Sequence, residues 1–180
     1  MQNIKTNLSA ILTFSAILLF IFIMYLALFS KNTTVQVSPL VGKTAPSFIL
    51  NTFDNKTISF ESLKGKSVVL NFWASWCIPC KEETSAINRA NLRFKDSNIV
   101  FIGVNIWDDR ENALNFIDLY PSDYANVYDP SNEIHVNYGI QGVPETFFIN
   151  KEGTILNRFQ GELNDNILNY FSNQLLNNKL

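Results

Sequence analysis

The sequence predicts an α/β sandwich, in which a mixed central β-sheet carries helices on both faces. Apolar runs rich in β-branched and aromatic residues alternate with segments of helical periodicity, and the last two runs flank a hairpin turn. Hydrophobic residues make up 47% of the 180-residue chain and charged residues 17%, which excludes a disordered chain. The formal net charge of −2 offers no basic surface, so we expect no nucleic-acid partner.

The first element is an uncharged apolar run of 22 residues, residues 8–29. As a helix it is roughly 33 Å long, enough to cross a hydrocarbon core of about 30 Å. We therefore predict one uncleaved transmembrane anchor. A cleaved signal peptide and a buried helix are the alternatives, but the run is long for a signal peptide and its end, Ala27 to Phe29, offers no small-residue cleavage site.

This anchor divides the chain into a short N-terminal cytoplasmic segment, the anchor, a polar stalk and a folded domain, over residues 1–7, 8–29, 30–42 and 43–180. Lys5 and the terminal amine on one side of the anchor balance Lys31 and Lys43 on the other. The positive-inside rule therefore does not decide the orientation.

The domain begins with a predicted hairpin over residues 48–50 and 57–60. Ser67–Trp73 is a continuous apolar run, as expected of a central strand that is buried on both faces. A helix begins after Trp76 and carries Pro79 in its first turn, where the missing N–H costs nothing.

The rest of the chain continues the alternation. We predict a second buried strand, a helix opened by Asp108 and Asp109, a short strand, a short helix ended by Gly139, two hairpin strands and a final amphipathic helix. Their ranges, in order, are 98–105, 108–120, 126–128, 131–138, 146–149, 154–159 and 163–175.

The chemistry is expected at Cys77 and Cys80, which are separated by Ile78 and Pro79. Cys77 stands where a buried strand gives way to a helix, so unpaired backbone N–H groups and the helix dipole stabilise a thiolate there. Cys80, about one turn further on, is placed to attack a mixed disulfide formed at Cys77. The pair can therefore exchange a dithiol for a disulfide.

Three other interpretations use the same cysteines: a purely structural disulfide, part of a zinc site with His135, and two unconnected buried thiols. A disulfide closing so short a loop stabilises little, and Cys77, Cys80 and His135 offer at most three zinc ligands. A position between a buried strand and a helix favours the redox pair. We expect no metal and no cofactor, and we expect His135 to be a surface or packing residue.

A second motif, residues 142–147, places Pro144 just before a predicted strand, where proline is tolerated. X-Pro bonds are the ones at which a cis peptide is common. From spacing alone, both the cis and the trans form stay open.

Together these segments resemble the thioredoxin fold. More narrowly, the chain is similar to the membrane-anchored extracytoplasmic branch, the TlpA/ResA/CcmG-DsbE-like cytochrome c maturation thioredoxins. The resemblance rests on residues 67–83 (SVVLNFWASWCIPCKEE), with residues 42–48 upstream and residues 142–148 downstream, and it covers residues 42–180. The stretch of residues 128–149 is especially similar to the cytochrome c maturation members. It implies a thioredoxin-like three-layer sandwich with an N-terminal β-hairpin extension.

The resemblance also implies roles for single residues. Cys77 matches the exposed nucleophile, Cys80 the buried resolving thiol, and Pro144 a cis-proline that lies beside them and pairs with the substrate backbone. The residues expected to contact the substrate are Trp76, Ile78, Pro79 and Val143.

Three polar residues extend the expected site. Asn71 stands where ordinary thioredoxins carry a buried Asp, as is usual in the anchored branch, and it cannot titrate, so the role of that Asp is open to some other acid. Glu83 and Glu145 match acids of the branch and are expected to be catalytic. For Glu83 the alternative is a solvated helix face. For Glu145 we predict that Glu145→Gln shifts the pKa of a cysteine.

The function implied is that of a thiol:disulfide reductase tethered to the inner membrane, with its catalytic domain on the periplasmic or extracytoplasmic side. Its implied substrates are protein disulfides such as the CxxCH of apocytochrome c, and its implied electron donor is a polytopic membrane protein. A general extracytoplasmic reductase, a peroxiredoxin-like peroxidase and a copper chaperone are the alternatives. Cys77 lacks the Thr-x-x-Cys setting of the peroxidase, and its spacing to Cys80 is shorter than the Cys-x3-Cys of the chaperone. The direction of electron flow stays open.

Overall fold

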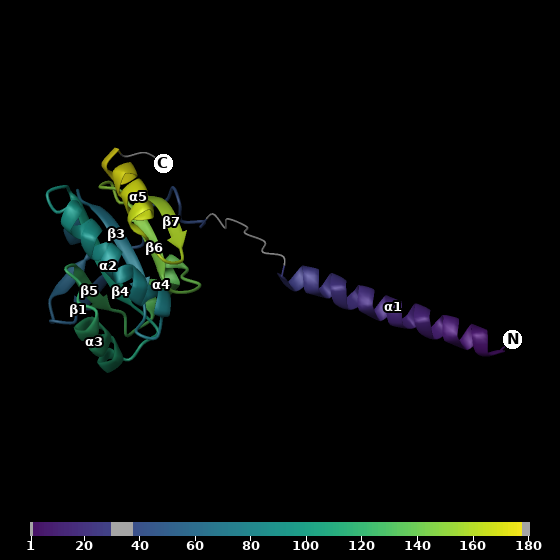
Figure 1. Cartoon of the computed structure of the whole chain (residues 1–180). Helices are drawn as coiled ribbons and strands as arrows, with labels where there is room; N and C mark the ends of the chain where they lie inside the picture. The colour runs from purple at the N-terminus through teal and green to yellow at the C-terminus, as the bar shows by residue number, and fades with distance from the viewer. Residues whose placement is uncertain (1, 30–37, 178–180) are drawn as a thin grey trace. The chain divides into compact units, whose positions relative to one another are not determined.

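A computed structural model describes the backbone of residues 2–29 and 38–177 (Figure 1). The chain divides into two units, an N-terminal one with helix α1 (Gln2–Phe29) and a folded domain, and each is described by itself. Within the described residues, we find no helix that is both long enough and apolar enough to span a membrane. The expected stalk falls mainly on residues 30–37, and these lie outside the described residues, as does residue 1 of the expected N-terminal segment.

The domain is built on one mixed sheet of seven strands in the order β2-β1-β5-β4-β3-β6-β7. Strands β3, β4 and β5 are parallel, whereas β6 pairs antiparallel with β3, and β7 with β6. The β1–β2 hairpin joins the sheet through an antiparallel pairing of β1 with β5. The strands are Ile49–Thr52 (β1), Thr57–Ser59 (β2), Ser67–Trp73 (β3), Ile99–Asn105 (β4), Ala125–Tyr128 (β5), Glu145–Ile149 (β6) and Ile155–Gln160 (β7).

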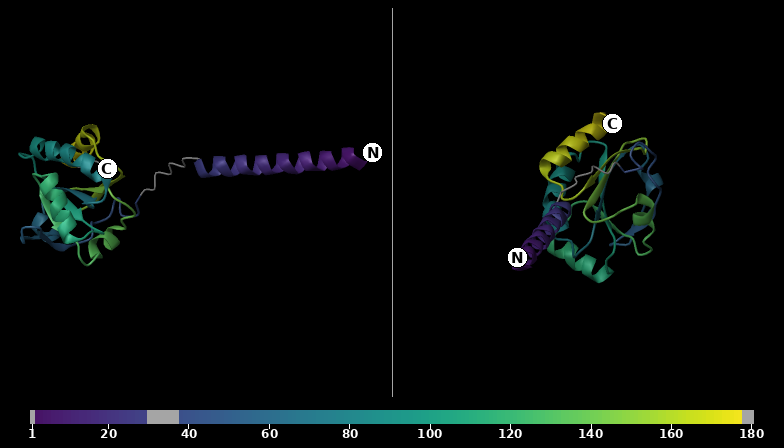
Figure 2. Two further views of the ribbon diagram at one scale, coloured as in Figure 1. Left: turned by 60° about the horizontal axis from the view of Figure 1, so that its bottom comes forward. Right: turned by 90° about the vertical axis from the view of Figure 1, so that its right-hand side faces the viewer.

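Helices cover both faces of this sheet, as predicted. Because side chains alternate along a strand, Val69 of β3 packs in the core cluster with residues of α2 and α5, whereas Leu70 packs on the opposite face with Tyr138 of α4. Figure 1 shows α5 (yellow) and α3 (green) at opposite ends of the domain, with α2 between them, and the right-hand view of Figure 2 again places α5 and α3 at opposite ends. The helices are α2 (Ile78–Arg93), α3 (Arg110–Leu119), α4 (Glu133–Tyr138) and α5 (Asp165–Asn177).

The predicted order of strands and helices is confirmed, and the differences are at the ends of elements. Helix α4 begins at Glu133, two residues later than expected, but it ends at Gly139 as predicted, with the positive φ of 62° that glycine adopts without strain. The short 3-10 helix Phe60–Leu63 was not expected. It forms because the hydroxyl of Ser59 accepts a hydrogen bond from the backbone N–H of Ser62.

The compact domain also extends beyond the expected boundary at residue 43. The backbone N–H of Gly42 donates to the carbonyl of Ile155 over 2.8 Å, and Ser38 is buried. Residues 38–42 were expected to belong to the stalk, but the structure packs them on the domain.

Candidate active site: a disulfide at the start of α2

The redox pair lies where β3 ends and α2 begins. Every residue of β3 is buried, so this strand fixes the short loop that follows it. Cys77 is the N-cap of α2, and its sulfur accepts a hydrogen bond from the backbone N–H of Cys80 over 3.2 Å. Pro79 lies in the first helical turn, as predicted. The sulfur of Cys77 therefore occupies the position at a helix start where negative charge is stabilised.

Cys77 and Cys80 are joined by a disulfide, with their Cα atoms 5.3 Å apart. The structure is thus that of the oxidised state, and the interpretation as two unconnected thiols is wrong. The expected contrast between an exposed Cys77 and a buried Cys80 is also absent in this state, because both residues are buried. The neighbouring residues Trp76 and Ile78 are the exposed ones, with 59% and 70% of their surface accessible to solvent.

A buried carboxylate follows Cys80 by one helical turn. Glu83 is only 1% exposed, so the alternative of a solvated helix face is wrong. Its two carboxylate oxygens accept hydrogen bonds from the side-chain amide of Asn71 and from the backbone N–H of Leu163, each over 2.8 Å. Burial raises the pKa of Glu83 to about 8, against the lowering effect of these two hydrogen bonds. A buried acid is therefore the hydrogen-bond partner of Asn71, which cannot itself titrate.

The cis-proline loop closes the other side of the site. The Val143–Pro144 peptide bond is cis, which confirms the expectation from the resemblance. Val143 packs against the cluster that contains Trp73, Cys77 and Cys80. The structure thus brings Val143 of this loop to both cysteines, and Pro144 follows Val143 directly in the chain.

Glu145, in contrast, faces away from α2. It pairs in register with Phe72, whose ring contacts Tyr138 of α4 on the opposite face of the sheet. Its buried carboxylate forms an ion pair with Arg158 and also accepts from the backbone N–H of Gln141 over 3.4 Å. The effect of Glu145→Gln on a cysteine pKa stays a prediction, and this geometry requires it to pass through β6 and the cis-proline loop.

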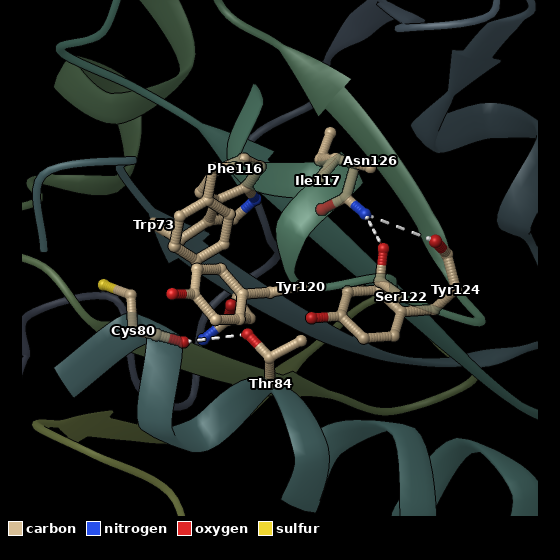
Figure 3. Close-up of a pocket in the computed structure, with 10 residues that line it drawn as sticks. Trp73, Cys80, Thr84, Phe116, Ile117, Tyr120, Ser122, Tyr124 and Asn126 are labelled. Carbon is tan, nitrogen blue, oxygen red and sulfur yellow. Dashed lines mark hydrogen bonds between the residues drawn. The ribbon is translucent and has the colours of Figure 1, made fainter. Parts of the chain in front are cut away.

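A small polar cavity adjoins Cys80 on the side of α3 (Figure 3). Its volume of about 10 Å³ is close to that of one water molecule, so it is too small for an organic ligand. Thr84 lies at its edge and donates its hydroxyl hydrogen bond to the carbonyl of Cys80 over 2.9 Å. Trp73 and Tyr120 also line this cavity, so Cys80 has aromatic and polar neighbours on this side.

Asp108 holds the loop in front of Cys77, a role that the sequence analysis missed. Its carboxylate accepts from the backbone N–H and the hydroxyl of Ser75, over 2.6 and 2.8 Å, and from the amide of Asn105 over 2.9 Å. We had expected Asp108 only to open a helix. The signal was available, because β3 and β4 are parallel and residues that follow parallel strands meet at one edge of a sheet.

A chain of contacts also links the tryptophan beside Cys77 to a buried acid. The indole N–H of Trp76 donates to the carbonyl of Trp107 over 3.0 Å, and the indole N–H of Trp107 donates to Nε2 of His135 over 3.1 Å. Because an indole N–H can only donate, Nε2 of His135 is the unprotonated nitrogen. Its Nδ1 then faces the buried carboxylate of Asp129 at 3.6 Å. His135 is therefore a packing residue, which is one of the two roles expected from the sequence.

Trp107 itself has a positive φ of 53°, which is unusual for a bulky residue. Backbone strain of this kind persists only where surrounding contacts impose it, and it gathers at functional sites. The contacts of Trp107 with Trp76 and His135 supply that constraint here.

The fold and this site define a class of protein, the thioredoxin-like proteins with a redox-active disulfide. The chain belongs to the AhpC/TSA family, whose model matches residues 41–158. It is 31% identical over 141 residues to the thiol-disulfide oxidoreductase ResA of Bacillus cereus, an alignment covering 78% of this chain and 79% of that protein. It is 32% identical over 130 residues to the thiol:disulfide interchange protein DsbE of Pseudomonas fluorescens, covering 71% of each chain.

Among solved structures, the chain resembles MTB DsbF, described in mixed oxidised and reduced forms, with a TM-score of 0.68 and 26% identity. That match covers 73% of this chain and 99% of the other. The protein is thus a thiol-disulfide oxidoreductase of the ResA/DsbE type.

We predict that the buried Glu83 makes the oxidised protein lose stability as the pH rises. Its pKa is raised from 4.5 to about 8 on folding, so its contribution is complete below pH 4.5 and is lost as the pH rises to about 8. The loss is on the order of 4 kcal/mol, at about 1.4 kcal/mol per pKa unit. Urea unfolding of the oxidised protein at pH 5 and pH 8.5 measures it.

Glu83→Gln should flatten this pH dependence, because an amide mimics the protonated acid. Glu82→Gln is the matched control, since Glu82 is the exposed neighbour on the same helix. If the Glu83→Gln protein still loses as much stability as the wild type between these pH values, burial of this carboxylate is not the cause.

We further predict that His135→Leu loosens the side chains of Trp107 and Trp76. The indole N–H of Trp107 loses its acceptor, at a cost of about 1 kcal/mol, and the Trp76 indole follows because it bonds to the Trp107 carbonyl. The chain has three tryptophans, so ¹⁵N NMR shows three indole signals. Those of Trp107 and Trp76 should shift and exchange faster with solvent.

The signal of Trp73 provides the internal reference, because Trp73 takes no part in the hydrogen bonds that join Trp76, Trp107 and His135. His135→Gln keeps an acceptor and should retain most of the wild-type spectrum. Equal shifts for the Leu and Gln variants, or no shift of Trp76 in either, would contradict the proposed linkage.

Proposed function

We propose that this protein is a membrane-tethered reductase of extracytoplasmic protein disulfides, such as the CxxCH disulfide of apocytochrome c. The observation that carries the redox part is the Cys77–Cys80 disulfide at the start of α2, with Glu83 buried one turn below it. The cytochrome c assignment is supported by the resemblance of residues 128–149 to the cytochrome c maturation thioredoxins.

The reaction follows from the positions of the two sulfurs. In the reduced protein the Cys77 thiolate attacks one sulfur of the substrate disulfide, and the other substrate sulfur leaves and takes a proton. Cys80 then loses its proton and attacks the Cys77 sulfur, which releases the second substrate sulfur. The substrate gains two electrons and two protons, and the protein is left with the Cys77–Cys80 bond.

Glu83 is suited to take the proton of Cys80. A base works best when its pKa is near that of the group it deprotonates and near the working pH. Burial brings the pKa of Glu83 to about 8, whereas a free cysteine thiol has a pKa of about 8.5. Both residues lie on the buried side of α2, three positions apart.

A location outside the cytoplasm and a membrane tether belong to the same proposal. They are supported by the uncharged run over residues 8–29 and by the resemblance to the anchored branch. In an oxidising compartment a reductase has to be recharged, and a polytopic membrane protein that carries thiol electrons is the proposed donor. The net direction of electron flow is decided by the redox potential, which we place nearer about −270 mV than the roughly −120 mV of a strong oxidant.

A peroxiredoxin-like thiol peroxidase is the competing proposal. The geometry favours thiol-disulfide exchange over peroxidase activity, because Cys77 and Cys80, with two residues between them, form a disulfide with each other. The general reductase, not tied to cytochrome c, is the nearer alternative.

Trapping of substrates tests this proposal. With Cys80→Ala, the mixed disulfide at Cys77 cannot be resolved, so we expect stable adducts of Cys77 with exported proteins, apocytochromes among them. The measurement is mass spectrometry of adducts released by reductant from the purified full-length variant. The control is the double variant Cys77→Ala with Cys80→Ala, which should trap nothing.

Adducts of other exported proteins without apocytochromes would overturn the cytochrome assignment and leave a general reductase. The absence of any adduct would overturn the reductase proposal itself.

A further inference from the structure

A groove runs from Cys77 along the surface between the start of α2 and helix α3. Its volume is about 490 Å³. Residues that line it from the two helices and the preceding loop include Trp76, Cys77, Ile78, Lys81, Phe116 and Leu119. Val143 and Pro144 of the cis-proline loop are not among the residues that line it.

The walls of this groove are unusually apolar for a surface. Trp76, Ile78 and Leu119 are 59%, 70% and 71% exposed, and they come from the active-site loop, α2 and α3. Large apolar side chains that gather on one exposed surface mark a contact site for a partner. Cys77 lines the same groove, so the chain of a substrate bonded to Cys77 has to pass near these residues.

The charge of the groove limits which substrate segments can bind in it. Lys81 is the one charged side chain among the described residues that line it, and its ammonium group lies 4.9 Å from the centre of the Tyr120 ring. A cationic segment is therefore disfavoured. Asn112 and Asn115 of α3 also line the groove, and their amides can hydrogen-bond to a peptide backbone.

We propose that this groove binds the polypeptide whose disulfide Cys77 attacks, and that it holds a large apolar side chain next to the attacked cysteine on a neutral or acidic segment. The inference rests on the proposed reductase function and adds its substrate preference. The mixed disulfide at Cys77 fixes one point of the substrate. The groove then sets the direction in which the substrate polypeptide runs from Cys77.

Two synthetic peptides test the preference. Each carries an intramolecular Cys-x-x-Cys disulfide in a neutral sequence, and the residue before the first cysteine is Phe in one and Asn in the other. Hydroxyethyl disulfide serves as a small substrate that reacts at Cys77 but is too short to fill the groove. Burial of one aromatic side chain predicts a kcat/KM about tenfold higher for the Phe peptide, mainly through KM.

Leu119→Glu should reduce this preference to less than about threefold, since it places a charge against the apolar side chain. Leu119→Ser, which removes the apolar contact without a charge, should act in the same direction. Because Leu119 is 71% exposed, neither change disturbs the core. Leu92→Glu is the matched control, because Leu92 is a 65% exposed leucine of α2 that does not line the groove.

The outcomes separate this inference from the proposed function. Equal rates for both peptides, or a preference that survives Leu119→Glu, would overturn the groove while reduction of hydroxyethyl disulfide upholds the redox function. Loss of reduction of all three substrates by the wild type would overturn the redox function and the groove with it.

Discussion

The hydrogen bond from the backbone N–H of Cys80 to the sulfur of Cys77 is the contact on which the chemistry depends. It places the attacking sulfur at the start of a sixteen-residue helix, where unpaired N–H groups favour an anion. The rest of the domain serves to hold this geometry. The fully buried strand β3 fixes the point where the chain leaves the sheet, and Asp108 fixes Ser75 in the loop that follows.

A second constraint is the buried carboxylate beneath the pair. An acid at 1% exposure destabilises the fold when it is ionised, and the hydrogen bonds from Asn71 and Leu163 offset only part of that effect. A purely structural position would be filled better by an apolar residue. The presence of a titratable group at this place supports the proposed role in moving the proton of Cys80.

Sequence analysis predicted the parts of the site that are local in the chain. The buried run Ser67–Trp73, the cysteine pair and the proline of the first turn follow from spacing and residue type, and the strand ends where it was expected. The cis bond before Pro144 followed from resemblance and not from spacing. The position of Glu83 was open, because helical spacing alone does not say which face α5 and its preceding loop cover.

The parts that could not be predicted depend on contacts between distant segments. The direction of the Glu145 side chain is set by the register of β6 against β3, which places it opposite Phe72 and away from α2. The contacts of Trp107 with Trp76 and His135 join three segments far apart in the sequence. Both cysteines are buried in the disulfide-bonded structure, and no pattern of residues specifies that oxidation state.

The pH dependence of alkylation at Cys77 tests most directly whether the start of α2 stabilises a thiolate. The reduced Cys80→Ser variant leaves a single thiol, so the rate of its reaction with iodoacetamide reports Cys77 alone. We predict half-maximal reactivity at a pH well below about 8.5, the pKa of a free cysteine, and rapid reaction at pH 7. A midpoint at or above that of free cysteine would contradict the account.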